Sequence, residues 1–347
     1  MFFLRFFAFL AFLTLFLTGC ANFSDQKSTI VHATPMADAS TMNRRAKELA
    51  QAIAPCQVRA LAFYPEKLAQ RHYFAEKELI AFIKECGFNR LYIYFVSPES
   101  LKIAKLSLLL EAAFESKIPV EAVLPESCYV IGRRGNSFIR PFVSGGTSLD
   151  DMLKNLRKFE SKRFKFAGVT VLAQPHLFTA GNPQRPKQLV YAWSNATFGA
   201  NLDNDKIMHM TLQKLAAFRA KLSPTPFTVG VPDFYEELVR EGKLSCGSIA
   251  DFEKIADKVM ICNTGNKPSE AVETVLNELK VAGSDSLLIS ITLAGHTSVT
   301  AGALRRRNWS DFIRSLSYGV KEYKRFPAFS GVVLGPFSQI ETLHQEK

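Results

Sequence analysis

The sequence predicts an α/β fold, a single closed (β/α)8 barrel that follows a signal peptide and a tether. Eight short apolar runs alternate with amphipathic stretches, which is the pattern of repeated βα units. No second linker divides this region, and such barrels often run to about 250 residues or more as one domain. The alternative is an open doubly wound sheet, which usually has a glycine-rich phosphate turn after its first strand. The sequence there is Phe63-Tyr64-Pro65-Glu66-Lys67, so the closed barrel is preferred.

The expected helices carry apolar residues at three- and four-residue spacing, as Leu79, Phe82 and Ile83 show. Glycine or proline lies near many of the joins, as at Gly87 and Pro327. The expected strands are Val58–Tyr64, Arg90–Phe95, Pro119–Leu124, Phe166–Ala173, Phe227–Pro232, Lys258–Asn263, Ser286–Leu293 and Ser330–Gly335. The expected helices are Lys67–Glu85, Pro98–Ser116, Ser148–Lys162, Asp205–Leu222, Ile249–Ala256, Pro268–Ala282 and Trp309–Phe326.

The first 19 residues have the features of a lipoprotein signal peptide. Residues Phe2 to Leu17 are apolar except for Arg5 and Thr14, and this run is shorter than the roughly 20 residues of a membrane-spanning helix. Leu-Thr-Gly then precedes Cys20, in the pattern of a lipoprotein processing site. We therefore expect cleavage before Cys20 and acylation of that cysteine, with palmitate among the chains. An uncleaved N-terminal anchor is the alternative.

The predicted organisation has three parts: a signal peptide over residues 1–19, the lipidated cysteine with a tether and lead-in over residues 20–55, and the barrel over residues 56–347. The start of the second part is small and polar, which is typical of a flexible tether. Ala21, rather than an aspartate, follows the cysteine. We therefore expect an outer membrane lipoprotein that faces the periplasm or the cell surface.

The net charge of +11 indicates anionic partners. Removal of Arg5 with the signal peptide leaves +10. A glycan, an acidic envelope polymer or phospholipid headgroups would fit this charge, and a protein partner is also possible. No nucleic-acid-binding motif is present, so nucleic acid is not expected. The basic residues are scattered along the predicted helices, which is also typical of a solvated surface.

Five cysteines follow Cys20, so at least one thiol stays unpaired. An oxidising periplasm would permit a disulfide, and Cys56 with Cys86 is the preferred pair because each precedes a predicted strand at the same end of the domain. No pair of cysteines has the spacing of a zinc site. We therefore expect neither a metal nor a cofactor.

In a (β/α)8 barrel the functional site forms at the carboxyl ends of the strands and in the loops that follow them. Two of these loops, Cys128 to Gly146 and Thr179 to Asn204, are longer than a barrel needs, which favours binding. The candidate catalytic residues are Glu126, Asp233 and Glu236. The candidate substrate-binding residues are Tyr64, Tyr94, Arg133, Arg134, Gln174, His176, Tyr235, Asn263 and His296.

These residue types suit a polar, ring-shaped ligand. Tyrosine rings stack on the apolar faces of sugars, and arginines bind carboxylates or phosphates. Each candidate also has a structural interpretation. Glu126 could begin a loop, Glu236 could open a helix whose N-terminus favours acids, and the histidines could be hydrogen-bonded framework residues.

Three segments, Phe166–His176, Asp257–Asn263 and Phe329–Gly335, resemble the fourth, sixth and eighth strands of chitinase-like glycoside hydrolases. The resemblance covers most of residues 56–343. It implies a barrel whose fourth strand points acids inward at alternate positions, the last of them being the proton donor. The corresponding residues here are Thr170, Leu172 and Gln174, so those carboxylates are absent.

Three functions follow from these observations. The preferred one is an anchored, glycosidase-like barrel that binds envelope or exported polysaccharide with weak or no hydrolysis. The second is an active glycoside hydrolase whose carboxylates come from other strands, with Glu126 and either Asp233 or Glu236 as the pair. The third is a structural envelope lipoprotein that docks a protein partner.

Overall fold

The computed structural model of the protein describes residues 38–69, 75–126, 148–161, 163–177, 179–182, 185–191, 203–263, 272–292 and 308–345. The side chains of residues 179–191, Ala69, Asn263 and Thr292 lie outside the description. No helix in these ranges combines the length and the hydropathy needed to cross a bilayer. The predicted signal peptide and Cys20 lie outside the described residues.

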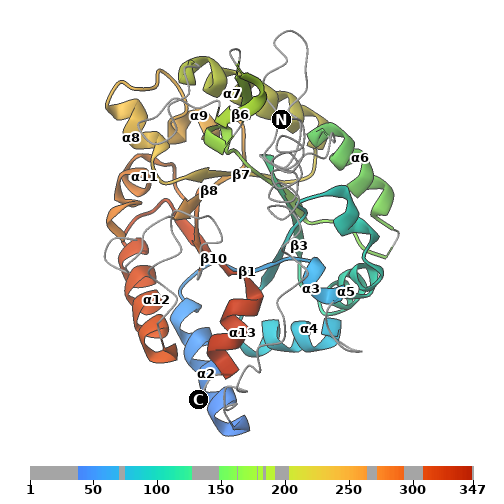
Figure 1. Ribbon diagram of the computed structural model, residues 1–347. Helices are drawn as coiled ribbons and strands as arrows, with labels where there is room; N and C mark the ends of the chain where they lie inside the picture. Colours follow the sequence, from blue (N-terminus) through green and yellow to red (C-terminus); the bar gives the residue numbers. More distant parts are fainter. Residues whose placement is uncertain are drawn as a thin grey trace, which may run out of the picture.

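Eight parallel strands form a closed barrel, as the sequence predicts (Figure 1). Around the barrel the order is β1-β10-β9-β8-β7-β4-β3-β2, and pairing of Val58 with Gly331 closes the ring. The predicted strands agree with the observed ones to within two residues at either end. The strands are β1 (Val58–Phe63), β2 (Arg90–Tyr94), β3 (Val120–Pro125), β4 (Gly168–Leu172), β7 (Phe227–Pro232), β8 (Lys258–Asn263), β9 (Leu287–Thr292) and β10 (Phe329–Gly335).

Helices surround the barrel on its outside (Figure 1). In place of the first expected helix there are two shorter helices, α3 (Glu66–Ala69) and α4 (Ala75–Glu85). In place of the second there is a 3-10 helix, η1 (Pro98–Lys102), followed by α5 (Ala104–Glu115). The others between strands are α6 (Leu149–Phe159), α7 (Asn204–Leu222), α8 (Tyr235–Arg240), α9 (Ile249–Glu253), α11 (Leu276–Val281) and α12 (Trp309–Tyr323), with a 3-10 turn, η3 (Pro175–Leu177), after β4.

Two helices that the sequence analysis did not predict, α2 (Ala39–Ile53) and α13 (Phe337–Gln345), lie side by side outside β1 and β10 (Figure 1). Asp38 caps α2 by accepting the amide of Thr41 at 2.7 Å. Arg45 of α2 donates to the carbonyl oxygen of His344 at 2.9 Å, and Leu49 of α2 is buried in the main core. Helix α2 is thus packed against the barrel although it lies in the predicted lead-in.

Alternate residues of each strand point into the barrel or outward against the helices. The inward residues form one apolar cluster and the outward residues belong to the larger core between sheet and helices. The inner cluster contains Val58, Ala60, Ala62, Tyr92, Tyr94, Val123, Leu172, Met260, Leu288 and Val333. The barrel is therefore filled by side chains in its middle, and any ligand site must lie at an end.

Two expectations were wrong. The segment after β4 contains an antiparallel hairpin, β5 (Thr179–Asn182) with β6 (Arg185–Tyr191), where only a loop was expected. Cys56 and Cys86 do not form a disulfide; both are free thiols inside the protein. Burial raises the pKa of each thiol to about 12.

Candidate functional site

The site develops at the carboxyl-terminal end of the barrel, which we call the mouth. Its wall includes inward-facing residues at or near the ends of five strands, namely Tyr64, Tyr94, Leu172, Cys262 and Ser290. The rings of Tyr64 and Tyr94 lie with their centroids 5.0 Å apart at an angle of 35°. Tyr94 is buried and hydrogen-bonds Ser290, whereas Tyr64 is half-buried. One ring is therefore fixed by the barrel and holds the other at the opening.

Strand β4 carries no carboxylate on its inner face. Thr170 donates its hydroxyl to Oε2 of Glu121 at 3.1 Å, deep in the barrel. Leu172 lies in the inner apolar cluster, where it fills the space next to Gly230 on β7. Gln174 follows the strand and is half-buried. The inward positions that resemble the acids of chitinase-like enzymes are thus a hydrogen-bonded threonine, a packed leucine and an amide.

Glu126 lies directly after β3 and is fully buried. Its Oε2 accepts the backbone amide of Gln174 at 3.1 Å, which extends the β3–β4 hydrogen bonding beyond the last paired residues, Pro125 and Leu172. Its Oε1 has no hydrogen-bond partner among the described residues. Burial raises the pKa of Glu126 to about 8, although the amide of Gln174 opposes the shift. At neutral pH this carboxyl group is therefore mainly protonated.

His176 and Tyr235 form a polar pair behind the ends of β4 and β7. The His176 Nδ1 atom lies 2.7 Å from the Tyr235 hydroxyl, and the same hydroxyl is 3.4 Å from the carbonyl oxygen of Ala173. Loss of solvent lowers the pKa of His176 to about 4, so its ring is neutral at pH 7. Burial, and to a smaller extent the charge that Glu126 carries when ionised, raises the pKa of Tyr235 well above its ordinary value. The geometry therefore links Glu126, Tyr235 and His176 electrostatically.

A second group of acids follows β7. Burial and then the charge of Asp233 raise the pKa of the Cys262 thiol to about 12. Burial likewise raises the pKa of Glu278 on α11 to about 7, with Asp233, Glu236 and Glu237 adding to the shift. Glu236 accepts the amide of Ile249 at 2.8 Å and so caps α9. Asp233 thus lies near Cys262 and Glu278, and Cys262 also acts, together with Glu126, on the pKa of Tyr235.

The structure therefore brings some predicted residues together and separates others. The rings of Tyr64 and Tyr94 are in contact. Glu126 is hydrogen-bonded to the amide of Gln174, and His176 to the hydroxyl of Tyr235. Glu236, in contrast, is hydrogen-bonded to the start of α9. Asn263 ends β8, but its side chain, together with Arg133, Arg134 and His296, lies outside the described residues. Within the described ranges, no three His, Cys, Asp or Glu side chains are grouped to hold a metal ion.

The sequence analysis missed two residues of the mouth, Cys262 and Ser290. Each lies two residues beyond an inward apolar residue of the same strand, Met260 and Leu288 respectively. The two-residue period of a strand would have placed both of them on the inner face.

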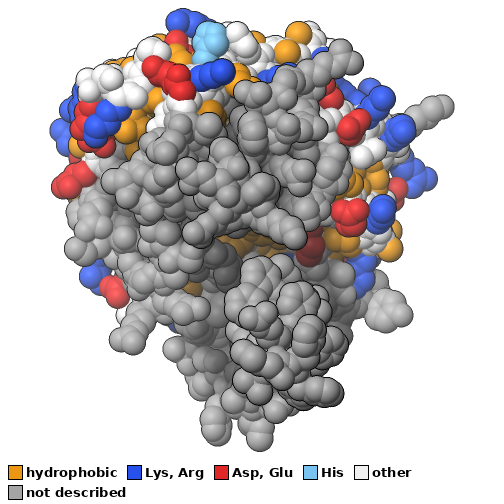
Figure 2. All heavy atoms as spheres, turned by 45° about the horizontal axis from the view of Figure 1, so that its top comes forward, with side chains coloured by type: hydrophobic (Ala, Val, Ile, Leu, Met, Phe, Trp, Pro, Cys, Tyr) orange, Lys and Arg blue, Asp and Glu red, His pale blue; other side chains and the backbone are white. Residues whose placement is uncertain are grey.

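In the space-filling view, basic and acidic side chains are mixed around the rim of the molecule (Figure 2). The basic excess of the chain is therefore not gathered into one patch among the coloured residues of this face.

No protein-family model and no curated protein matches the sequence. Among solved structures, the PgaB (BpsB) glycoside hydrolase domain from Bordetella bronchiseptica is 12% identical, with a TM-score of 0.43 and coverage of 83% of this chain and 98% of that one. Endo-beta-N-acetylglucosaminidase from Cordyceps militaris is 11% identical, with a TM-score of 0.42 and 87% coverage of each chain.

A deoxyribose phosphate aldolase from Aeropyrum pernix is similar to the same degree, at 10% identity, a TM-score of 0.39 and coverage of 88% of this chain and 97% of that one. Glycoside hydrolases and an aldolase are thus matched to a similar degree. At TM-scores below 0.5 these matches select neither a family nor a reaction for this chain.

Proposed function

We propose that this chain is a membrane-anchored, glycosidase-like barrel that binds an envelope or exported polysaccharide at its mouth and hydrolyses it weakly or not at all. The observation that carries the proposal is the composition of the mouth: the half-buried ring of Tyr64 lies against the buried ring of Tyr94, and the inner face of β4 has no carboxylate. A tyrosine ring binds the apolar face of a sugar, whereas a threonine, a leucine and an amide cannot supply the proton that glycosidic cleavage requires.

The proposed location rests on the sequence. Cys20 follows a short apolar run and precedes a polar tether, which favours acylation and outer membrane retention. A barrel held in this way works beside envelope polymers. This location favours a glycan over a small cytoplasmic metabolite.

Titration calorimetry with N-acetylglucosamine oligomers, peptidoglycan fragments and an acidic polysaccharide tests the binding. We expect at least one of these glycans to bind, and Tyr64→Ala to weaken that binding about tenfold, because the ring contributes contact area as well as stacking. Tyr318→Ala is the matched control, since Tyr318 is a 49% exposed ring on α12, away from the mouth. Absence of binding by the wild-type chain, or equal binding by Tyr64→Ala, would contradict the proposal.

One observation favours an active hydrolase as the second candidate. Glu126 is a protonated carboxyl group at neutral pH, and a raised pKa is what a general acid needs. The buried Asp233 would then supply the second carboxylate. Release of reducing ends from a bound glycan would support this candidate if Glu126→Gln and Asp233→Asn each abolished it. Turnover that survives both substitutions would exclude this pair.

A further inference from the structure

A groove of about 550 Å³ lies between α2 and α12 on the outside of the barrel, apart from the mouth. Its floor is apolar, with Ala52 and Pro55 from the end of α2 and Ile313 and Val320 from α12. Its edge carries polar and charged groups, namely Glu48, Gln51, Ser317, Lys321, Lys324 and Arg325. The combination of an apolar floor and a basic edge suits an amphiphilic anion.

The acid at the edge of the groove is already neutralised. Glu48 accepts from Arg44 at 2.7 Å through Oε1 and from the Trp309 indole at 2.7 Å through Oε2. Arg325 is paired too, with Glu322 at 2.9 Å. The charge of Glu48 is therefore not available to offset the lysines across the groove.

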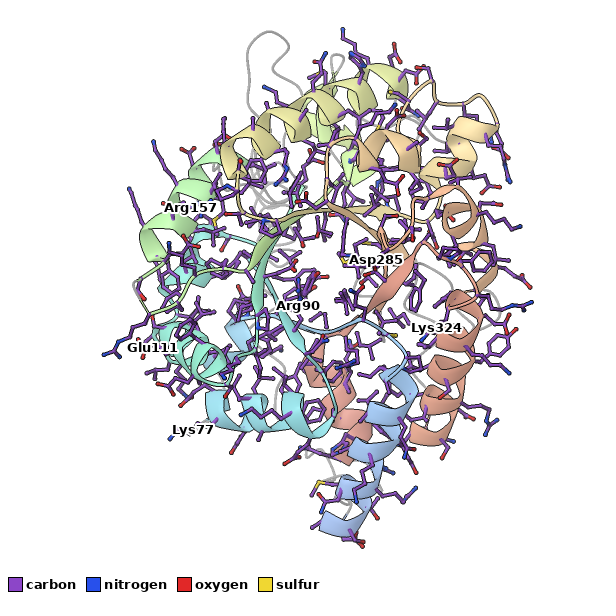
Figure 3. The ribbon with its side chains drawn as sticks, turned by 180° about the vertical axis from the view of Figure 1, so that it is seen from behind. Lys77, Arg90, Glu111, Arg157, Asp285 and Lys324 are labelled. Atoms are coloured by element: carbon purple, nitrogen blue, oxygen red, sulfur yellow. The ribbon has the colours of Figure 1, made fainter. Side chains whose placement is uncertain are left out.

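Neither lysine forms an ion pair with an acid in the part of the chain that the structure describes. Lys324 donates to the carbonyl oxygen of Pro55 at 3.1 Å, a contact that leaves its positive charge uncompensated. Lys321 is exposed and makes no ion pair with any described residue. Lys321 lies in the last turn of α12 and Lys324 is its C-cap residue, which Figure 3 shows from behind near the end of that helix. The groove thus has an excess positive charge concentrated over its apolar floor.

The groove also has a defined position along the barrel axis. Pro55 and Lys324 directly precede β1 and β10, so they lie where the strands begin, at the end opposite the mouth. The 17 residues between Cys20 and Asp38 span at most about 60 Å when extended. This length lets an anchored barrel turn that end toward the membrane.

We propose that the groove between α2 and α12 binds the headgroup of an anionic phospholipid, so that the barrel rests on the membrane with its mouth turned toward the envelope polymers. The phosphate would lie between Lys321 and Lys324, and the start of an acyl chain would contact Ile313 and Ala52. This inference rests on the proposed membrane anchor, but it concerns a surface that the glycan site does not use.

Sedimentation with vesicles tests the inference on residues 21–347, which contain every described element of the barrel and lack the acylated cysteine. The probes are vesicles of phosphatidylglycerol and phosphatidylethanolamine, compared with vesicles of phosphatidylcholine alone. We expect binding to the anionic vesicles only. Lys321→Glu with Lys324→Glu should weaken it at least tenfold, because each lysine near an anionic leaflet contributes roughly fivefold.

The matched control is Lys154→Glu with Lys158→Glu on α6, an equal change of charge on exposed lysines across the barrel. This control double variant should weaken vesicle binding no more than about threefold, because it only lowers the overall positive charge that attracts the protein to an anionic membrane. Equal loss in the two double variants would overturn the groove as the site, as would binding that does not depend on anionic lipid. Because no glycan is present in the vesicle experiment, its result is independent of the calorimetry that tests glycan binding at the mouth.

Discussion

Replacement of Glu121 by alanine should lower the free energy of unfolding by about 2 to 3 kcal/mol, because it removes a buried carboxylate that accepts from a half-buried arginine and from buried hydroxyl groups. Glu121 on β3 is 3% exposed and is paired with Arg90, which points into the barrel from β2 (Figure 3). Its second oxygen accepts from Thr170 at 3.1 Å, and the buried Tyr92 shares the network. Alanine would leave two buried hydroxyl groups without their acceptor, whereas the half-buried Arg90 guanidinium could be partly hydrated.

Urea unfolding followed by circular dichroism measures this effect. The control is Asp150→Ala, which breaks the exposed pair of Asp150 with Lys221 and should cost less than about 1 kcal/mol. A second variant, Arg90→Met with Glu121→Leu, removes both charges and should recover most of the loss. If Glu121→Ala cost no more than Asp150→Ala, the ion pair would not support the barrel in the way we infer.

The barrel itself could be predicted because all eight strands are buried on both faces. Runs such as Phe227–Pro232 and Lys258–Asn263 are short, apolar and bounded by turn residues, so their pattern specifies a parallel strand without tertiary information. The hairpin β5–β6 was missed because Pro186 lies within β6, and proline argues against a central strand. In a sheet of two strands both are edges, where proline is tolerated.

Helix α2 was missed for a different reason. Its sequence is polar overall, and its packing depends on a few apolar residues, such as Leu49 and Ile53, that contact helices distant in sequence. The pairing of Cys56 with Cys86 was wrong because order along the chain says which end of a strand a cysteine precedes, but not where its sulfur points.

The sequence analysis looked for site residues after the ends of the strands, but it missed Cys262 and Ser290 and could not predict which carboxyl groups are ionised. Glu126 and Glu236 both follow strands, yet the carboxyl of Glu126 extends the β3–β4 hydrogen bonding, while Glu236 accepts the first backbone amide of α9. These roles depend on backbone amides contributed by other strands and helices. Only the assembled structure shows that Glu126 is buried with one oxygen unsatisfied among the described residues.

That burial should make the stability of the protein fall as the pH rises from about 4.5 to about 8. The pKa of Glu126 is about 8 in the folded state, against 4.5 for the ordinary carboxyl, so the folded state binds the extra proton between these values. Stability therefore falls with rising pH across this window, by at most about 1.4 kcal/mol per pH unit. The pKa of Glu278 is raised to about 7, so this group also lowers the stability as the pH rises, up to about pH 7.

His176 acts in the opposite direction below pH 6.5. Its pKa of about 4 lies below the ordinary 6.5, so the unfolded state binds the extra proton there and stability rises with pH. Between pH 4.5 and 6.5 the rise due to His176 offsets only one of the two declines due to Glu126 and Glu278, and above pH 6.5 only the declines remain. These three groups therefore place the maximum of stability near pH 4.5, with a loss of about 2 to 3 kcal/mol between pH 6.5 and pH 8.

Glu126→Gln should abolish most of that loss, because glutamine keeps the acceptor for the Gln174 amide but cannot ionise. The free energy of unfolding, measured in urea from pH 5 to 9, should differ most between the variant and the wild type at pH 8 and above. Glu115→Gln, an exposed substitution on α5, should leave the wild-type profile unchanged. A variant profile that still declines between pH 7 and 8 would mean that Glu126 is already ionised in the folded protein. The general acid proposed for the hydrolase alternative would then be lost with it.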